Sequence, residues 1–166
     1  MKMNTPTTRQ AVMAGTCVGT INTSDVYEAG LVELYERTYP PLHNDAYVMF
    51  ARQRTTTPPH TTKEITLSFS KEQPNGTYDA ASNSHIVRIT FADYSVPDKP
   101  VIYTQNGGTA ELKYDVTTGV FSGTLTSVVV ENHDDDVDKT LTLDMTFSAN
   151  KNTAMSSRSR TRSIAA

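Results

Sequence analysis

The stretch that decides the fold is Leu141-Thr142-Leu143-Asp144-Met145-Thr146-Phe147, near the end of the 166-residue chain. Its four apolar side chains alternate with two threonines and one aspartate. Successive side chains of a β-strand point to opposite faces of a sheet, so the stretch has one apolar face and one solvated face. This pattern is typical of an antiparallel strand that packs on a core with a single face.

Further strands are predicted on both sides of this stretch. Three segments alternate in the same way: residues 65–69, 87–91 and 110–116. Five others are β-prone but less regular: residues 13–21, 30–35, 46–51, 101–104 and 120–130. The chain also holds 26 Thr, and Thr fits a pleated strand better than a helix. We therefore predict an all-β domain, an antiparallel β-sandwich or flattened barrel of about nine strands.

Local signals refine this prediction. The alternation of residues 120–130 slips between Thr126 and Val128, and a one-residue bulge there would put Phe121, Leu125, Val128 and Val130 on one face. Asn106-Gly107-Gly108 predicts a hairpin between the strands at residues 101 and 110. Residues 25–35 could form one or two helical turns at most. One core is expected from Ile65, Leu67, Phe69, Val87, Ile89, Phe91, Leu112, Tyr114, Leu141, Leu143, Met145 and Phe147.

Charge divides the chain into three parts. Six of its 15 basic residues and none of its 18 acidic ones lie in the first twelve and last sixteen residues, which leaves residues 13–150 with a net charge of −9. Residues 1–10 are interpreted as a flexible lead-in and residues 11–150 as one β-sandwich or barrel domain. Residues 151–166 are interpreted as a disordered basic tail rich in Ser and Arg. An acidic body repels phosphate, so the domain is not expected to bind nucleic acid.

The most distinctive motif is the acidic segment of residues 131–138, Glu-Asn-His-Asp-Asp-Asp-Val-Asp, which holds five carboxylates between two strong strands. Asp134, Asp136 and Asp138 have the spacing of a crowded oxygen ligand set for Ca²⁺. Lys139 and Met145 stand where an EF-hand loop requires Gly and Glu, so the helical form of that site is excluded. We favour a solvated hairpin tip over a calcium site.

Tyrosines near loops are the candidate ligand-binding residues. The chain has 8 Tyr and no Trp. Tyr39, Tyr47, Tyr94 and Tyr103 lie in or beside predicted strand ends and loops, where a ring can stack on a sugar or on a partner surface.

Catalytic motifs are missing from the sequence. It has no nucleophile elbow, phosphate-binding loop or dinucleotide fingerprint, and its four histidines have no zinc-binding spacing. We interpret these histidines as surface residues, and the single Cys17 as a small packed side chain. No cofactor is expected, and no catalytic residue is assigned.

These observations favour a non-catalytic binding or protein-interaction module that recognises a protein, a small molecule or a carbohydrate. Two alternatives stay open: a barrel with a small ligand in an internal cavity, and a self-assembling structural subunit such as a coat or appendage protein. No apolar run reaches the ~20 residues of a membrane span. Without a secretory signal or a disulfide, a cytoplasmic location is the default expectation, although export without a signal would look the same.

Overall fold

The computed structural model describes residues 15–134 and 139–151. This part of the chain folds entirely into strands and connections, which confirms the all-β prediction. None of its segments forms a helix long and apolar enough to cross a membrane. The lead-in of residues 1–10 and all of the tail beyond residue 151 lie outside the described residues. The strands are β1 Gly15–Ile21, β2 Asp25–Glu28, β3 Leu31–Thr38, β4 Asp45–Arg54, β5 Thr62–Ser70, β6 Gly76–Asp79, β7 Val87–Asp93, β8 Val101–Gln105, β9 Thr109–Asp115, β10 Val120–Asn132 and β11 Lys139–Asn150.

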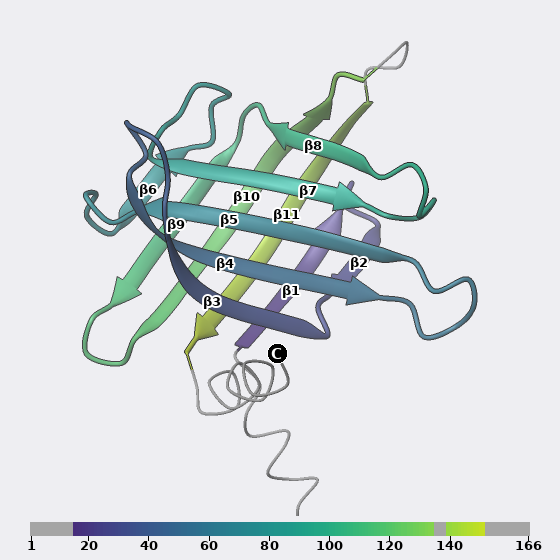
Figure 1. Ribbon diagram of the computed structural model, residues 1–166, viewed down its shortest axis with the longest axis horizontal. Helices are drawn as coiled ribbons and strands as arrows, with labels where there is room; N and C mark the ends of the chain where they lie inside the picture. Colours follow the sequence, from purple (N-terminus) through teal and green to yellow (C-terminus); the bar gives the residue numbers. More distant parts are fainter. Residues whose placement is uncertain (1–14, 135–138, 152–166) are drawn as a thin grey trace, which may run out of the picture.

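The sheet curls because two consecutive strands lie at its opposite ends. Its order is β2-β1-β11-β10-β8-β7-β5-β4-β3, with every neighbouring pair antiparallel. Only Ala29 and Gly30 separate β2 from β3, so the first and last strands of this path must come together. The Ala29 N–H donates to the Cys17 carbonyl on β1, and the Gly30 N–H donates to the Arg52 carbonyl on β4, each at 2.9 Å. The result is a half-barrel (Figure 1).

The half-barrel has two layers that cross each other. Strands β3, β4, β5, β7 and β8 form one layer, and the long strands β10 and β11 run across behind it with β1 (Figure 1). Strand β10 belongs to both layers, because residues 120–126 pair with β9 whereas Val130 and Glu131 pair with β8. Strand β9 also pairs with the four-residue strand β6, which extends the rear layer.

The change of partner along β10 takes place at the predicted bulge. Leu125 pairs with Met145 and Val128 pairs with Leu143, so two residues of β10 oppose one residue of β11. The extra residue is Ser127, whose φ of 50° lies in the left-handed region. Its N–H donates to Asp144 Oδ1 at 2.8 Å. All four side chains predicted to share a face are buried, so the predicted bulge is confirmed.

Two local predictions are wrong. The Asn106-Gly107-Gly108 turn does not form a hairpin, because β8 and β9 do not pair with each other and instead each pairs with a different part of β10. It carries the chain from one layer to the other past the bulge, so closely that a Cβ on Gly108 would lie 2.3 Å from the Ser127 carbonyl oxygen. Residues 25–35, for which one or two helical turns at most were expected, form strand β2 and the first part of β3. The described part of the chain has eleven strands, nine of them on the main path of the sheet.

The core lies between the two layers. Ten of the twelve predicted core side chains are buried, and the other two, Tyr114 and Leu141, are partly buried against them. Aromatic rings fill the centre, where Phe121 lies with its ring centroid 5.1 Å from Phe147 and 6.0 Å from Phe69. The interior of the half-barrel is therefore occupied by packed side chains.

Candidate functional site

The four candidate tyrosines lie in separate places. Tyr39 covers the outer side of the front layer, with its ring centroid 5.0 Å from that of His43. Tyr47 lies between the layers, Tyr94 follows β7, and Tyr103 is 5% exposed with its ring edge against Phe91 in the core. These tyrosines do not form one surface, and their assignment as ligand-binding residues stays a prediction.

The acidic segment is described only in part. Asp134 caps its own strand end, because its N–H donates to Asn132 Oδ1 at 3.1 Å and its Oδ2 accepts from Asn132 Nδ2 at 3.2 Å. Asp136 and Asp138 lie outside the described residues. Among residues 15–134 and 139–151, no three His, Cys, Asp or Glu side chains are grouped to hold a metal ion.

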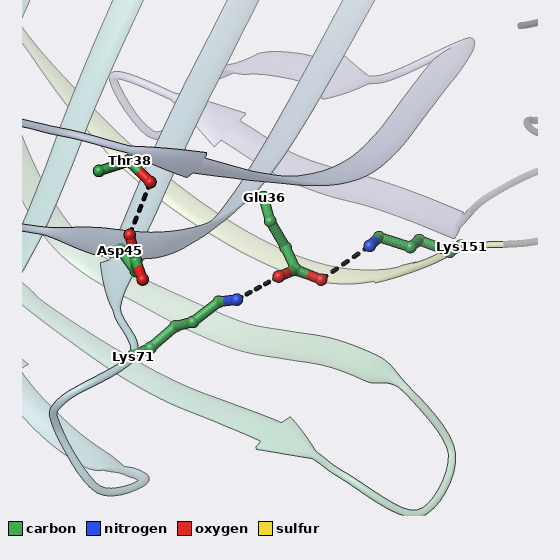
Figure 2. A network of polar contacts seen from close by, with 5 residues as sticks. All are labelled: Glu36, Thr38, Asp45, Lys71 and Lys151. Carbon is green, nitrogen blue, oxygen red and sulfur yellow. Dashed lines mark hydrogen bonds and ion pairs between the residues drawn. The ribbon is translucent and has the colours of Figure 1, made fainter.

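A cluster of charged side chains joins the two layers at one end of the half-barrel (Figure 2). Glu36 on β3 accepts hydrogen bonds from Lys71, which follows β5, and from Lys151, which follows β11. Lys151 Nζ lies 2.7 Å from Glu36 Oε2. These two hydrogen bonds, that from Lys151 first, lower the pKa of Glu36 to about 2. One carboxylate on β3 accepts from two ammonium groups, so we interpret this cluster as a clasp between β3 and β11.

An aromatic pair lies under this clasp. The rings of Tyr47 and Tyr114 stack with centroids 3.8 Å apart, and Lys71 Nζ lies 4.9 Å from the centroid of Tyr47. Burial raises the pKa of the Tyr47 hydroxyl, as does the neighbouring Tyr114. Since these rings contact each other and the lysine, they stabilise the contact between the layers.

An open hollow of about 540 Å³ lies on the outer face of the rear layer. Its lining residues come from β6, β9, β10 and β11 and from the loop before β6. That loop is held to β9 by Asn75, whose Oδ1 accepts from the Tyr114 N–H at 2.8 Å and whose Nδ2 donates to the Tyr114 carbonyl at 3.3 Å. The hollow is lined by Asn75, Gly76, Glu111, Leu112, Lys113, Ser122, Gly123, Thr124, Thr146 and Phe147.

Register brings the polar side chains of this hollow together. Thr124 on β10 pairs with Glu111 on one side and with Thr146 on the other, and Ser122 pairs with Lys113. The side chains of directly paired residues lie on the same face of a sheet. Within the described residues, none of these five side chains makes a hydrogen bond or an ion pair. The hollow therefore holds a carboxylate, an ammonium group and three hydroxyls that are available to a ligand.

This hollow could not be predicted from the alternation of the sequence. Alternation places Glu111, Thr124 and Thr146 on a solvated face, but a flat face and a hollowed face give the same pattern. The curvature at this point depends on pairing between strands that are distant in sequence. The Gly123 between Ser122 and Thr124 is a weak signal, because glycine inside a strand marks a bend or a close approach. A Cβ at Gly123 would lie 2.5 Å from the Glu111 carbonyl oxygen.

One histidine departs from the prediction that all four are surface residues. His43 is 6% exposed, and its ring nitrogens lie within hydrogen-bond distance of Ser68 and His85. The Pro-rich sequence around His43 does not indicate burial, because the burial depends on a tertiary contact between this loop and β5.

No family model, curated protein or solved structure matches this chain.

Proposed function

We propose that this domain is a non-catalytic binding module that takes a hydroxyl-rich ligand, a carbohydrate, in the hollow over β6, β9, β10 and β11. The observation that carries the proposal is a set of polar side chains that make no hydrogen bond or ion pair with the described part of the chain: Glu111, Lys113, Ser122, Thr124 and Thr146. Hydroxyls, a carboxylate and an ammonium group provide both donors and acceptors for the hydroxyl groups of a sugar.

Pre-organisation of the hollow also supports binding. Its polar groups stand on paired strands, so little backbone order must be gained when a ligand enters. The adjoining loop is fixed by the two hydrogen bonds of Asn75 to β9. A polar group that is already positioned loses less entropy on binding than one on a mobile segment.

The composition of the hollow favours binding over catalysis. Glu111 is the single carboxylate among the lining residues, and no lining residue is a His or a Cys. Glycoside hydrolysis generally requires two carboxyl groups on either side of the scissile bond. A ligand held here would meet hydrogen-bonding groups but no acid–base pair.

The two alternative functions make different demands. A ligand in a lumen needs an internal cavity, whereas Phe69, Phe121 and Phe147 fill the space between the layers. This packing favours a binding site on the outer face. A self-assembling subunit would show a size on a sizing column that depends on concentration. A constant monomeric size from micromolar to millimolar protein would favour the binding module.

The test is a titration followed by amide NMR, with maltopentaose, cellopentaose, chitopentaose and pentagalacturonate as probes. We expect at least one probe to shift the amides of Glu111, Thr124 and Thr146. Thr146→Val and Glu111→Gln should then each weaken binding about tenfold, because one hydrogen bond is worth roughly 1.4 kcal/mol at such a site. Thr140→Val is the matched control, since Thr140 is also exposed on β11 but lies outside the hollow.

A negative result has a definite form. If none of the four sugars shifts these amides at millimolar concentration, the proposed function is wrong. The same holds if binding occurs but Thr146→Val and Thr140→Val weaken it equally, because the ligand would then contact another surface.

A further inference from the structure

A histidine is buried on the outer side of the front layer, away from the core. His43 belongs to the connection between β3 and β4, residues 39–44, and is 6% exposed. Its Nε2 lies 2.8 Å from Ser68 Oγ on β5, and its Nδ1 lies 2.5 Å from the His85 carbonyl oxygen in the segment before β7. One imidazole therefore joins a loop, a central strand and a second loop.

These two contacts define the protonation state of the ring. A backbone carbonyl can only accept, so Nδ1 carries the hydrogen and donates it to the His85 carbonyl. Nε2 is then the unprotonated nitrogen and accepts the Ser68 hydroxyl hydrogen. Both contacts are satisfied by the neutral imidazole. A proton added at Nε2 would face the Ser68 hydroxyl and force it to give up its role as donor.

The surroundings also disfavour a charged ring. The ionisable groups that face it are Tyr39 on its own loop, His85 before β7 and Arg88 on β7, and β5 offers only the Ser68 hydroxyl. Burial lowers the pKa of His43, and the charge of Arg88 and the neighbouring His85 lower it further, against the opposing hydrogen bond to the His85 carbonyl. Among these groups no carboxylate is present to stabilise an imidazolium ion.

The loop contacts the outer face of β4 and β5 where His43 meets Ser68. Ala46, Val48, Ser68 and Ser70 point away from the core, because they alternate with core residues along β4 and β5. All four are nevertheless buried, at 2% exposure or less. Two of them are apolar and two carry small hydroxyls, so the patch consists of small, weakly polar side chains.

We propose that His43 is an acid-sensitive latch: the neutral ring holds residues 39–44 on β5, and its protonation releases this loop and uncovers the outer face of β4 and β5. The direction follows from linkage. The released loop returns the histidine to water, where its pKa is about 6.5, so the released state binds the proton more tightly than the latched state. The stabilisation of the closed loop by the neutral ring is fully present above about pH 6.5. It decreases as the pH falls from there toward the lower pKa of the buried ring.

The first experiment follows the loop and the ring separately in the wild-type protein. Amide hydrogen exchange at His43 and Asn44, whose N–H groups both donate to the Pro40 carbonyl, reports on the loop. After correction for the intrinsic exchange rate, we expect protection to fall by up to about tenfold per pH unit below pH 6.5. The Tyr94 amide, bonded to the Thr62 carbonyl in another loop, is the internal control. The ring itself is titrated by NMR of labelled histidine and should show a midpoint below 6.5.

His43→Gln is the matched variant. A glutamine amide can donate to the His85 carbonyl and accept from Ser68, but it does not titrate. Loop protection in His43→Gln should therefore be independent of pH between 7.5 and 5. Ser68→Ala gives a second test that needs no change at His43: without the hydroxyl donor the neutral ring is less favoured, so the NMR midpoint of His43 should rise.

Three results would overturn the latch. The first is unchanged protection of His43 and Asn44 in the wild-type protein from pH 7.5 to 5. The second is an equal loss of protection in His43→Gln. The third, which decides the matter if His43→Gln does not fold, is a His43 midpoint that Ser68→Ala leaves unmoved.

Discussion

Tyr47 and Tyr114 stack with their ring planes 10° apart, and through this pair β4 of the front layer contacts β9 of the rear layer. The two rings come from strands that share no backbone hydrogen bond. Side chains, and not sheet pairing, therefore join the layers at this end of the half-barrel, with the clasp of Glu36, Lys71 and Lys151 above the rings.

The stack should have a measurable coupling energy. A double-mutant cycle with Tyr47→Leu and Tyr114→Leu should give a coupling of about 1 kcal/mol in the free energy of unfolding, as aromatic pairs generally do. Urea unfolding of the two single variants and the double variant measures it. A cycle of Tyr47→Leu with Tyr103→Leu, whose ring lies against Phe91, is the control and should be additive. Additivity in both cycles would contradict the role of the stack.

Glu36 should make the stability depend on pH in the acidic range. Its pKa in the folded protein is about 2, below that of an unfolded glutamate, so its stabilising effect is present above about pH 4.5 and is lost as the pH falls toward 2. Glu36→Gln should cost about 1 kcal/mol or less at pH 7, because the side chain is 42% exposed. The difference in stability between the variant and the wild-type protein should shrink as the pH falls through 2. Glu111→Gln, without an ion pair among the described residues, is the control; an equal effect there would argue against the clasp.

Leu143 tests the face assigned to the deciding stretch. Its side chain is fully buried, so Leu143→Ala should destabilise the protein by about 2–5 kcal/mol. Val116→Ala, at a side chain that is 84% exposed, should change the free energy of unfolding by less than about 0.5 kcal/mol. Chemical denaturation of both variants provides the comparison. A loss below about 1 kcal/mol at Leu143 would mean that the core is packed differently.

Ser127→Gly should stabilise the protein. Ser127 has a φ of 50° at the bulge, a conformation that costs an ordinary residue about 1–2 kcal/mol and glycine almost nothing. Glycine also loses more conformational entropy on folding, which offsets part of this relief. We therefore expect a net gain of about 0.5–1 kcal/mol in the free energy of unfolding. The neighbouring Thr126→Gly has no such strain to relieve and should destabilise by a similar amount. Thermal unfolding that ranks the two variants in the opposite order would refute this account of the bulge.

Calcium should act on this protein only as a salt. Asp134 already exchanges two hydrogen bonds with Asn132, which fits a solvated turn. We expect calcium chloride to raise the Tm no more than sodium chloride at the same ionic strength. A calcium-specific rise that disappears in the variant carrying Asp134→Asn and Asp136→Asn would establish a metal site instead.

The sequence predicts strands far better than it predicts their partners. Alternation identified the faces of the strands around Leu67, Ile89 and Leu143, because burial on one side forces a period of two. The slip at Thr126 even located the bulge. The hairpin expected at Asn106-Gly107-Gly108 failed because glycine permits a turn without determining which strands follow it in register.

The candidate sites were less predictable still. The hollow around Thr124 depends on sheet curvature, and the burial of His43 depends on a loop that folds over β5. Both arise from contacts between segments distant in sequence, which a local sequence pattern does not predict. Tyr103 shows the opposite error: its place beside a predicted loop suggested exposure, but alternation along β8 turns its ring into the core.

The pairing of Gly15 with Ala149 has a consequence for synthesis of the chain on the ribosome. Strand β1 precedes the other described strands in the sequence, yet its longest partner, β11, follows all of them. Strands β3, β4, β5 and β7 pair with neighbours close in sequence and can form a sheet while translation continues. Until β11 arrives, β1 has only the four residues of β2 to pair with, and one edge of it stays open to other nascent chains. We therefore expect truncated products that end before residue 139 to aggregate.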